Sequence, residues 1–248
     1  MKRLAELTWT EAADERARQP IVLVPIGSTE AHGPHLPLST DAILSDELAR
    51  RAGEALEADG RTVLIAPTLS YAITEYAAAF AGTISLSPET ATNLVAEVCA
   101  SLALQGFQRV CLVNSHLEPA HVVSLKDACA RAEAKSGQKV AFPDQLDRRW
   151  ARTLTEEYKR GACHAGSYET SLVLAARPEL VRNDVRARLS PLPIDLAQAM
   201  KAGKRTFGEA GAADAYFGDP AAATTDEGNA IYALLVTMVV STVRETWP

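Results

Sequence analysis

The chain has 248 residues, of which 47% are hydrophobic and 23% are charged, a composition typical of a globular protein with a substantial buried core. Its formal net charge of −6 gives no sign of a nucleic-acid partner or of an anionic membrane as a partner. No apolar stretch is long enough to span a bilayer, and the N-terminal segment lacks the apolar run of a signal peptide. The four cysteines are scattered without paired spacing, which indicates reduced thiols in a cytoplasmic protein.

The apolar pattern predicts strands that alternate with helices. Continuous apolar runs rich in β-branched residues indicate strands buried on both faces, at residues 21–26, 62–66, 109–113 and 139–142. Helical spacing of apolar residues predicts helices at residues 7–18, 42–59, 87–105, 122–134, 148–159 and 225–243. This alternation predicts the α/β fold class, with one doubly wound domain over residues 1–248 and parallel strands.

Two stretches have no clear period. Residues 68–87 are predicted as a long loop, and loops of that length in a compact domain usually serve as binding loops or lids. Residues 177–220 are rich in proline, glycine and charge, and are predicted as irregular surface with short helices. Doubly wound folds bind ligands outside the carboxyl ends of their strands, so the loops that follow the strands are the candidate site.

The stretch from Gly27 to Asp41, GSTEAHGPHLPLSTD, directly follows the first predicted strand. It contains the carboxylate of Glu30, the imidazole of His32 two residues later and the carboxylate of Asp41, the donor types that divalent metals take. The glycines and prolines between them allow turns that bring separated donors together. The alternative is an ordinary polar loop in which Asp41 caps the next helix and His32 has no ligand role.

A second donor pair, His116 and Glu118, directly follows the third predicted strand. If the backbone is extended there, both side chains project to one face. We therefore expect the two loops to meet and to hold metal. The alternative is a structural histidine that caps the following helix. For the neighbouring His35 and His121 we favour structural roles or roles in supporting the metal ligands.

His164 and Glu169 form a third cluster. His164 would suit a proton donor, because the unperturbed pKa of histidine lies near neutral pH. The alternative is a helix N-terminus, where an acid interacts favourably with the helix dipole. Three aromatic residues are candidates for a pocket wall, although such residues more often belong to the core: Tyr71, Trp150 and Tyr168.

Other reaction classes lack their sequence signatures in this chain. There is no Gly-x-Ser-x-Gly elbow, and the adjacent Ser115 and His116 do not make a serine–histidine catalytic pair. The phosphate-binding loop and the Gly-x-Gly-x-x-Gly fingerprint are also missing. A nucleotide-binding protein therefore has only the fold class in its favour.

Four segments resemble the successive motifs of the creatininase family of amidohydrolases: GSTEAHGPHLPLSTD, AGTISLSPET, LVNSHLEPAH and HAGSYETS. The resemblance covers roughly residues 3–182 and keeps the family's order. It implies a three-layer α/β/α fold, two adjacent divalent metal ions in each chain and a homo-oligomer, commonly a hexamer. It also implies the metal ligands. For one metal these are Glu30, Asp41 and His116, and the other metal shares Asp41 and adds His32 and a glutamate.

The identity of that glutamate follows from a comparison with creatininase itself. Creatininase has a glutamate two residues after the third-motif histidine and uses it as a ligand, which implies Glu118 for the second metal. Glu169 is then a supporting residue or an alternative ligand. The resemblance further implies that His164 donates a proton to the leaving nitrogen, while Glu118 or Glu169 shuttles protons.

The substrate-contacting positions of creatininase correspond to Thr74 and Leu117, and Trp150 falls near one of its active-site tryptophans. Leu117 stands where creatininase has an aromatic residue, and residues 159–162 lack its second substrate-stacking tryptophan. The flat aromatic sandwich suited to creatinine is therefore incomplete.

The sequence thus predicts metal-assisted hydrolysis of a carbon–nitrogen bond in a small amide or cyclic amide, with a water activated by two ions of zinc, manganese or iron. Other branches of the family suggest a peptide, or a formamide intermediate of cofactor or natural-product biosynthesis, as the substrate. From a different class of protein, the alternative is a non-catalytic metal-binding scaffold.

Overall fold

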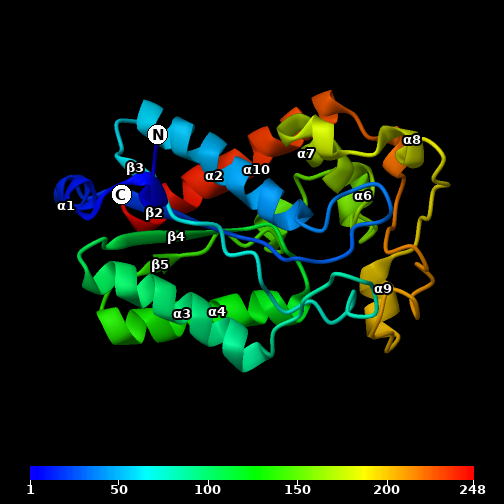
Figure 1. Cartoon of the computed structure of the whole chain (residues 1–248), viewed down its shortest axis with the longest axis horizontal. Coiled ribbons are helices and arrows are strands. Elements are labelled where there is room, and N and C mark those ends of the chain that lie inside the picture. Colours follow the sequence, from blue (N-terminus) through cyan, green and yellow to red (C-terminus); the bar gives the residue numbers. More distant parts are fainter.

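The centre of the fold is a five-stranded parallel sheet, as seen in the computed structural model, which describes residues 1–248 (Figure 1). Its strands, in spatial order, are β1 (Lys2–Arg3), β3 (Val63–Ile65), β2 (Ile21–Ile26), β4 (Arg109–Asn114) and β5 (Val140–Ala141). The central pair runs in register from Ile21 opposite Arg109 to Ile26 opposite Asn114. The predicted α/β fold class is confirmed.

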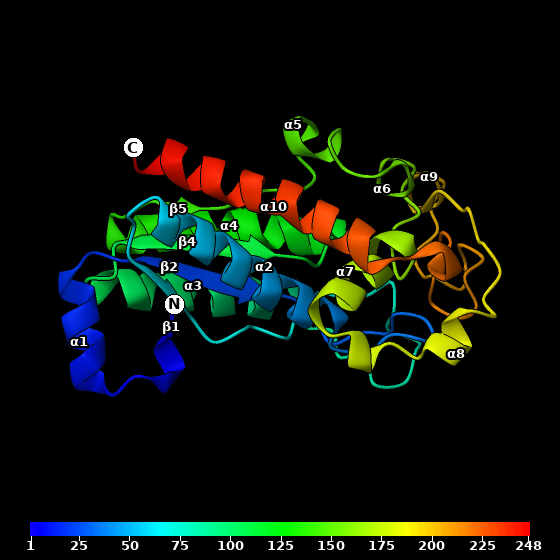
Figure 2. The same cartoon turned by 90° about the horizontal axis from the view of Figure 1, so that it is seen from above.

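Helices cover both faces of this sheet and complete three layers (Figures 1 and 2). One face carries α3 (Pro88–Leu104) and α4 (Pro119–Ser136), and the other carries α2 (Thr40–Ala58), α7 (Ser167–Ala176) and α10 (Thr225–Thr246). Along β2, Ile21 and Leu23 pack into the core beneath α2, whereas Val22 and Val24 pack into the core beneath α3. Both faces are buried, which explains the continuous apolar run in the sequence.

The remaining helices are short. They are α1 (Trp9–Ala17), α5 (Arg148–Ala151), α6 (Glu156–Lys159), α8 (Asn183–Arg186) and α9 (Leu196–Lys201). The single helix predicted at residues 148–159 is wrong. Thr155 starts a new helix, because its hydroxyl caps α6 by accepting a hydrogen bond from the Tyr158 N–H. No helix in the structure combines the length and the apolar character needed to cross a membrane.

Strand β1 was not predicted, since two residues carry no periodic signal. It lies at the sheet edge and pairs in parallel with β3. The sequence also indicated only the N-terminus of α7, whose first turn carries Glu169. The second difference bears on the site, because α7 supplies one of its carboxylates.

Gly228 allows α10 to pack closely against α7. A Cβ at this position would overlap the backbone carbonyl of Ser171. We predict that Gly228→Ala lowers the free energy of unfolding by about 1–3 kcal/mol, because an overpacked contact must be relieved by helix displacement. Urea denaturation would measure this. Gly208→Ala is the matched control, where an added Cβ meets only Thr206 Oγ1 at 4.0 Å, and an equal loss in both variants would contradict the prediction.

Candidate metal centre and active site

Polar side chains from distant parts of the chain meet at the carboxyl ends of β2 and β4. Glu30 and His32 come from the loop after β2, and Asp41 comes from the start of α2. His116 comes from the loop after β4, Glu169 from the first turn of α7, and His164 from the loop before α7. All six are buried. The strand β2 approaches α2 closely here, since a Cβ at Gly27 would overlap the backbone of Ala42.

Asp41 lies at the centre of the cluster and faces two histidines with different oxygens. Its Oδ2 lies 2.9 Å from Nδ1 of His116, and its Oδ1 lies 3.2 Å from Nε2 of His32. Glu30 completes the first group, with Oε1 3.4 Å from Nδ1 of His116. Glu169 completes the second, with Oε2 3.5 Å from Nε2 of His32. The donors thus form two metal-sized groups that share Asp41.

Hydrogen bonds to the backbone fix the orientation of the three histidine rings. Each ring places one nitrogen against a backbone carbonyl: His116 Nε2 against Ile73 at 2.7 Å, His32 Nδ1 against Glu30 at 3.2 Å, and His164 Nε2 against Ala31 at 3.0 Å. A ring nitrogen that donates to a carbonyl leaves the other nitrogen with its lone pair. In all three rings that second nitrogen faces the carboxylates, as in metal-binding histidines.

The carboxylates are oriented by donors from neighbouring residues. The Ser28 hydroxyl donates to Asp41 Oδ2 at 2.8 Å, and the Thr74 hydroxyl donates to Glu30. The backbone N–H of Ala165 donates to Glu169 Oε2 at 2.6 Å. Ala165 has φ of 52°, a left-handed conformation that is unfavourable for alanine. The turn before α7 therefore holds Glu169 at a cost in backbone strain.

The electrostatics of the cluster fit a bound cation. Burial alone would lower the pKa of His32, but Asp41 and Glu169 outweigh burial and raise it to about 10. Glu30 and Asp41 likewise overcome burial and raise the pKa of His116 well above its ordinary value. His32 Nε2 is also buried without a hydrogen-bond partner. Imidazole and carboxylate donors without thiolate suit zinc, manganese or iron, so the donor set fits a pair of divalent metals.

Glu118, which the resemblance implied as the second metal's glutamate, belongs to neither group. Its carboxylate accepts hydrogen bonds from the backbone N–H groups of Glu75 at 3.2 Å and Tyr76 at 3.3 Å. Burial raises its pKa to about 7. The carboxylate beside His32 is Glu169, which comes from α7, and Glu118 instead fastens the loop that contains Thr74.

His164 lies at the edge of the cluster, on the wall of a cavity. Its Nδ1 is 3.8 Å from Oε1 of Glu30, and it forms a third possible ligand group with Glu30 and His32. Its ring packs against Phe207, with 4.3 Å between the ring centroids. Burial and the neighbouring His32 lower the pKa of His164 to about 4. The imidazole is therefore neutral at pH 7, with one lone pair turned toward the metal ligands.

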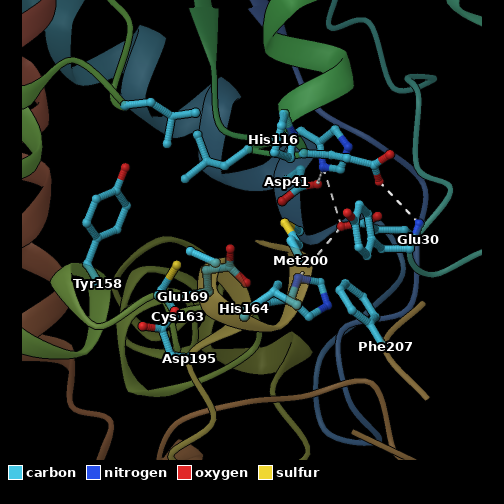
Figure 3. Close-up of a pocket in the computed structure, with 18 of the residues that line it drawn as sticks. Glu30, Asp41, His116, Tyr158, Cys163, His164, Glu169, Asp195, Met200 and Phe207 are labelled. Carbon is cyan, nitrogen blue, oxygen red and sulfur yellow. Dashed lines mark hydrogen bonds and ion pairs between the residues drawn. The ribbon is translucent and has the colours of Figure 1, made fainter. Parts of the chain in front are cut away.

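A cavity of about 460 Å³ opens above the cluster (Figure 3). Glu30, Asp41 and His116 lie together on its floor, and Tyr158 lies on the far side from them. Its walls combine the start of α4, the segment from Leu146 to Cys163, and α9. The wall residues are Tyr76, Leu117, Glu118, Pro119, Leu146, Tyr158, Lys159, Gly161, Cys163, Asp195, Leu196, Ala197, Met200, Lys201 and Phe207.

Of the predicted substrate-contacting residues, only Leu117 lines this cavity. Thr74 is buried and its hydroxyl is hydrogen-bonded to Glu30, and Tyr71 is 51% exposed. Trp150 packs against the core and stacks under Arg149, and Tyr168 is buried beside Gln145. These four residues were predicted to contact the substrate, but they do not line the cavity.

Another part of the cavity wall was not predicted from the sequence. That wall uses Tyr76 and Phe207 together with Met200 from α9. The only signal available was the aspartate before α9, which caps this helix by accepting from the Gln198 N–H at 2.8 Å. A six-residue helix has too few turns for an apolar periodicity to stand out.

Comparisons with known proteins agree with this geometry. A family model described as creatininase, creatinine amidohydrolase, matches residues 5–243. The mycofactocin precursor peptide peptidase of Mycobacterium tuberculosis (strain ATCC 25618 / H37Rv) is 31% identical over 252 residues, which cover 99% of this chain and 93% of the relative.

Two solved structures are also similar over 99% of this chain and 98% of theirs. One is a crystal structure of creatinine amidohydrolase (creatininase), with a TM-score of 0.77 and 25% identity. The other is described as creatininase Mn, with a TM-score of 0.74 and 26% identity. On this footing the chain belongs to the creatininase family of metal-dependent amidohydrolases, which hydrolyse carbon–nitrogen bonds.

Proposed function

We propose that this protein is a two-metal hydrolase that cleaves an amide bond in a peptide or peptide-like substrate. The observation that carries the proposal is the pair of donor groups that share Asp41 on the floor of a substrate-sized cavity. Glu30, Asp41 and His116 would hold one metal, and His32, Asp41 and Glu169 the other. The manganese named for a similar creatininase structure agrees with this donor set, as do zinc and iron.

Divalent cations in such a site supply Lewis acidity, which activates a water and polarises a carbonyl group. The residues of the chain then position and move protons. The neutral His164, with Nε2–H held by the Ala31 carbonyl, presents Nδ1 to accept a proton and return it to the leaving nitrogen. The proton donor expected from the sequence therefore begins the cycle as a base. Glu118 would hold the loop at Tyr76 in place beside the substrate.

The cavity supports a peptide-like amide better than creatinine. None of the three tryptophans lines it, so the ring-stacking pair expected for a flat heterocycle is missing. A volume of about 460 Å³ falls in the range that holds a drug-sized ligand, more than one small ring needs. The similar mycobacterial protein is named as a peptidase of a precursor peptide, and its likeness covers nearly the whole of this chain.

The oligomeric state of the protein and its cellular compartment are predictions from the sequence. The resemblance implies a homohexamer, and an oligomer would cover part of the exposed apolar surface, which includes Leu38, Tyr71 and Ile84. All four cysteines are free thiols, which agrees with a reducing, cytoplasmic environment.

The reaction can be tested with metal-loaded protein, N-acetylated peptides and creatinine. We expect peptide cleavage with little turnover of creatinine. We expect His164→Gln to lower kcat by about 10²–10⁴, because a positioned proton carrier contributes about that much. Tyr71→Phe, outside the cavity, is the control and keeps full activity. If no amide is turned over with both metals bound, the protein is a metal-binding scaffold and the proposed function is wrong.

Metal content distinguishes the two candidate glutamates. We predict that wild-type protein binds about two divalent ions per chain and that Glu169→Gln retains about one, as expected for a site that loses one of three protein ligands. Glu118→Gln retains both, since that carboxylate binds backbone N–H groups. Elemental analysis of dialysed, folded variants measures this. Loss of metal from Glu118→Gln with retention in Glu169→Gln would reverse the assignment, and full retention in Asp41→Ala would remove the bridge.

The stability of metal-free protein should depend on pH. The raised pKa values of His32, His116 and Glu169 mean that the folded protein keeps protons that the unfolded chain releases. For the two histidines this contribution is lost as the pH rises above about 6.5, their ordinary pKa, whereas for Glu169 the loss begins above about 4.5 and continues to about pH 8. The histidines with lowered pKa matter only below about pH 6.5: His35, His121 and His164.

We therefore predict that chelator-treated protein loses stability between pH 6.5 and 8.5, at up to about 1.4 kcal/mol per pH unit for each group involved. Metal-loaded protein changes little over this range, because the cations replace the protons. Denaturation of both forms across this range measures the difference. Identical pH profiles for the two forms would show that the cluster does not hold the metal.

A further inference from the structure

The charged side chains that line the cavity are unevenly paired. Five are acidic and two are basic: Glu30, Asp41, Glu118, Glu169, Asp195, Lys159 and Lys201. Lys159 pairs with Glu156 at 2.8 Å. Asp195 caps α9, and Glu118 binds backbone N–H groups, so both already have partners. Lys201, in the last turn of α9, makes no ion pair and no side-chain hydrogen bond.

Helix α9 holds Lys201 in place as part of the cavity wall. The backbone N–H of Leu196, at the start of α9, donates to the Gly161 carbonyl at 3.0 Å. Gly161 is three residues before His164 and lines the same cavity. The helix is thereby fastened to the segment that leads to His164, and its last residue, Lys201, lines the cavity and is exposed to solvent. A favourable interaction with the helix dipole explains a lysine in a last turn, but it leaves the ammonium group without a partner.

Much of the cavity lining besides the metal ligands and Lys201 is apolar. It includes Leu117 and Leu146, and Leu196 and Met200 from α9. An amide substrate placed over the metal ligands would therefore lay an apolar side chain along this wall. Beyond that side chain it would meet the single unpaired cation of the cavity.

We propose that Lys201 selects substrates whose carboxyl terminus lies close to the scissile amide, by pairing with the terminal carboxylate. The inference rests on the proposed function and specifies its substrate class as short peptides, or acylated amino acids, that end in an apolar residue with a free carboxylate. A peptide supplies such an anion at its own end, so no further ligand is required. Lys201 is a binding residue here and takes no part in bond cleavage.

The test compares matched N-acetylated tripeptides that end in leucine, one with a free carboxylate and the other with a carboxamide. Wild-type enzyme should show a kcat/KM for the carboxylate about three- to fivefold higher, the effect expected of a solvent-exposed ion pair. The difference should lie in KM and should shrink at high salt. Lys201→Gln should abolish the preference, and Lys201→Arg, which keeps the charge, should retain it.

Lys204→Gln is the matched control, because Lys204 is exposed three residues further along and does not line the cavity. It should keep the preference for the carboxylate. Cleavage of both peptides at equal rates, or a preference that survives Lys201→Gln, would overturn this inference while leaving peptide hydrolysis intact. Cleavage of neither peptide by the metal-loaded wild type would overturn the proposed function together with it.

Discussion

Three buried carboxylates lie close together in this protein, with no lysine or arginine beside them. Glu30, Asp41 and Glu169 are all at most 5% exposed, and their only ion-pair partners are histidines. Removing charges from water is unfavourable, and like charges at this separation repel each other. Bound protons offset this in the metal-free state and divalent cations do so in the metal-bound state. The cations thus contribute to holding the loops together as well as to chemistry.

Two other histidines of the motifs show how the fold keeps that cluster in place. The ring of His35 hydrogen-bonds with Thr170 at 2.9 Å, and that of His121 with Asn114 at 3.3 Å. Burial lowers the pKa of both rings, to about 4 and about 3, so they stay neutral behind the charged cluster. Asn114 in turn donates to the backbone carbonyl of His116 at 2.6 Å. These contacts agree with the structural role that the sequence favoured for both histidines.

The sequence predicts the floor of the site much better than its walls. Strand runs such as residues 21–26 are recognisable because both faces are buried, and parallel strands bring the loops after them to one edge. The sequence does not reveal whether Glu118 or Glu169 completes the second group of metal ligands. That choice depends on whether one side chain turns toward the backbone N–H groups of a loop forty residues away, and no local pattern encodes that contact. The wall from α9 was missed because its position depends on a tertiary bond to Gly161.

Glu118 shows how the metal ligands on the floor of the cavity and the shape of its walls are joined. The loop from Thr74 to Tyr76 touches the floor through the Thr74 hydroxyl, which orients Glu30, and forms the wall through the Tyr76 side chain. Glu118 fastens the same loop through two backbone N–H groups. A carboxylate in that place couples ligand geometry to cavity shape. The part of the wall that comes from α9 makes no hydrogen bond to a candidate metal ligand. It can vary in shape and charge while the metal ligands keep their geometry, so substrate choice can diverge on a common hydrolytic centre.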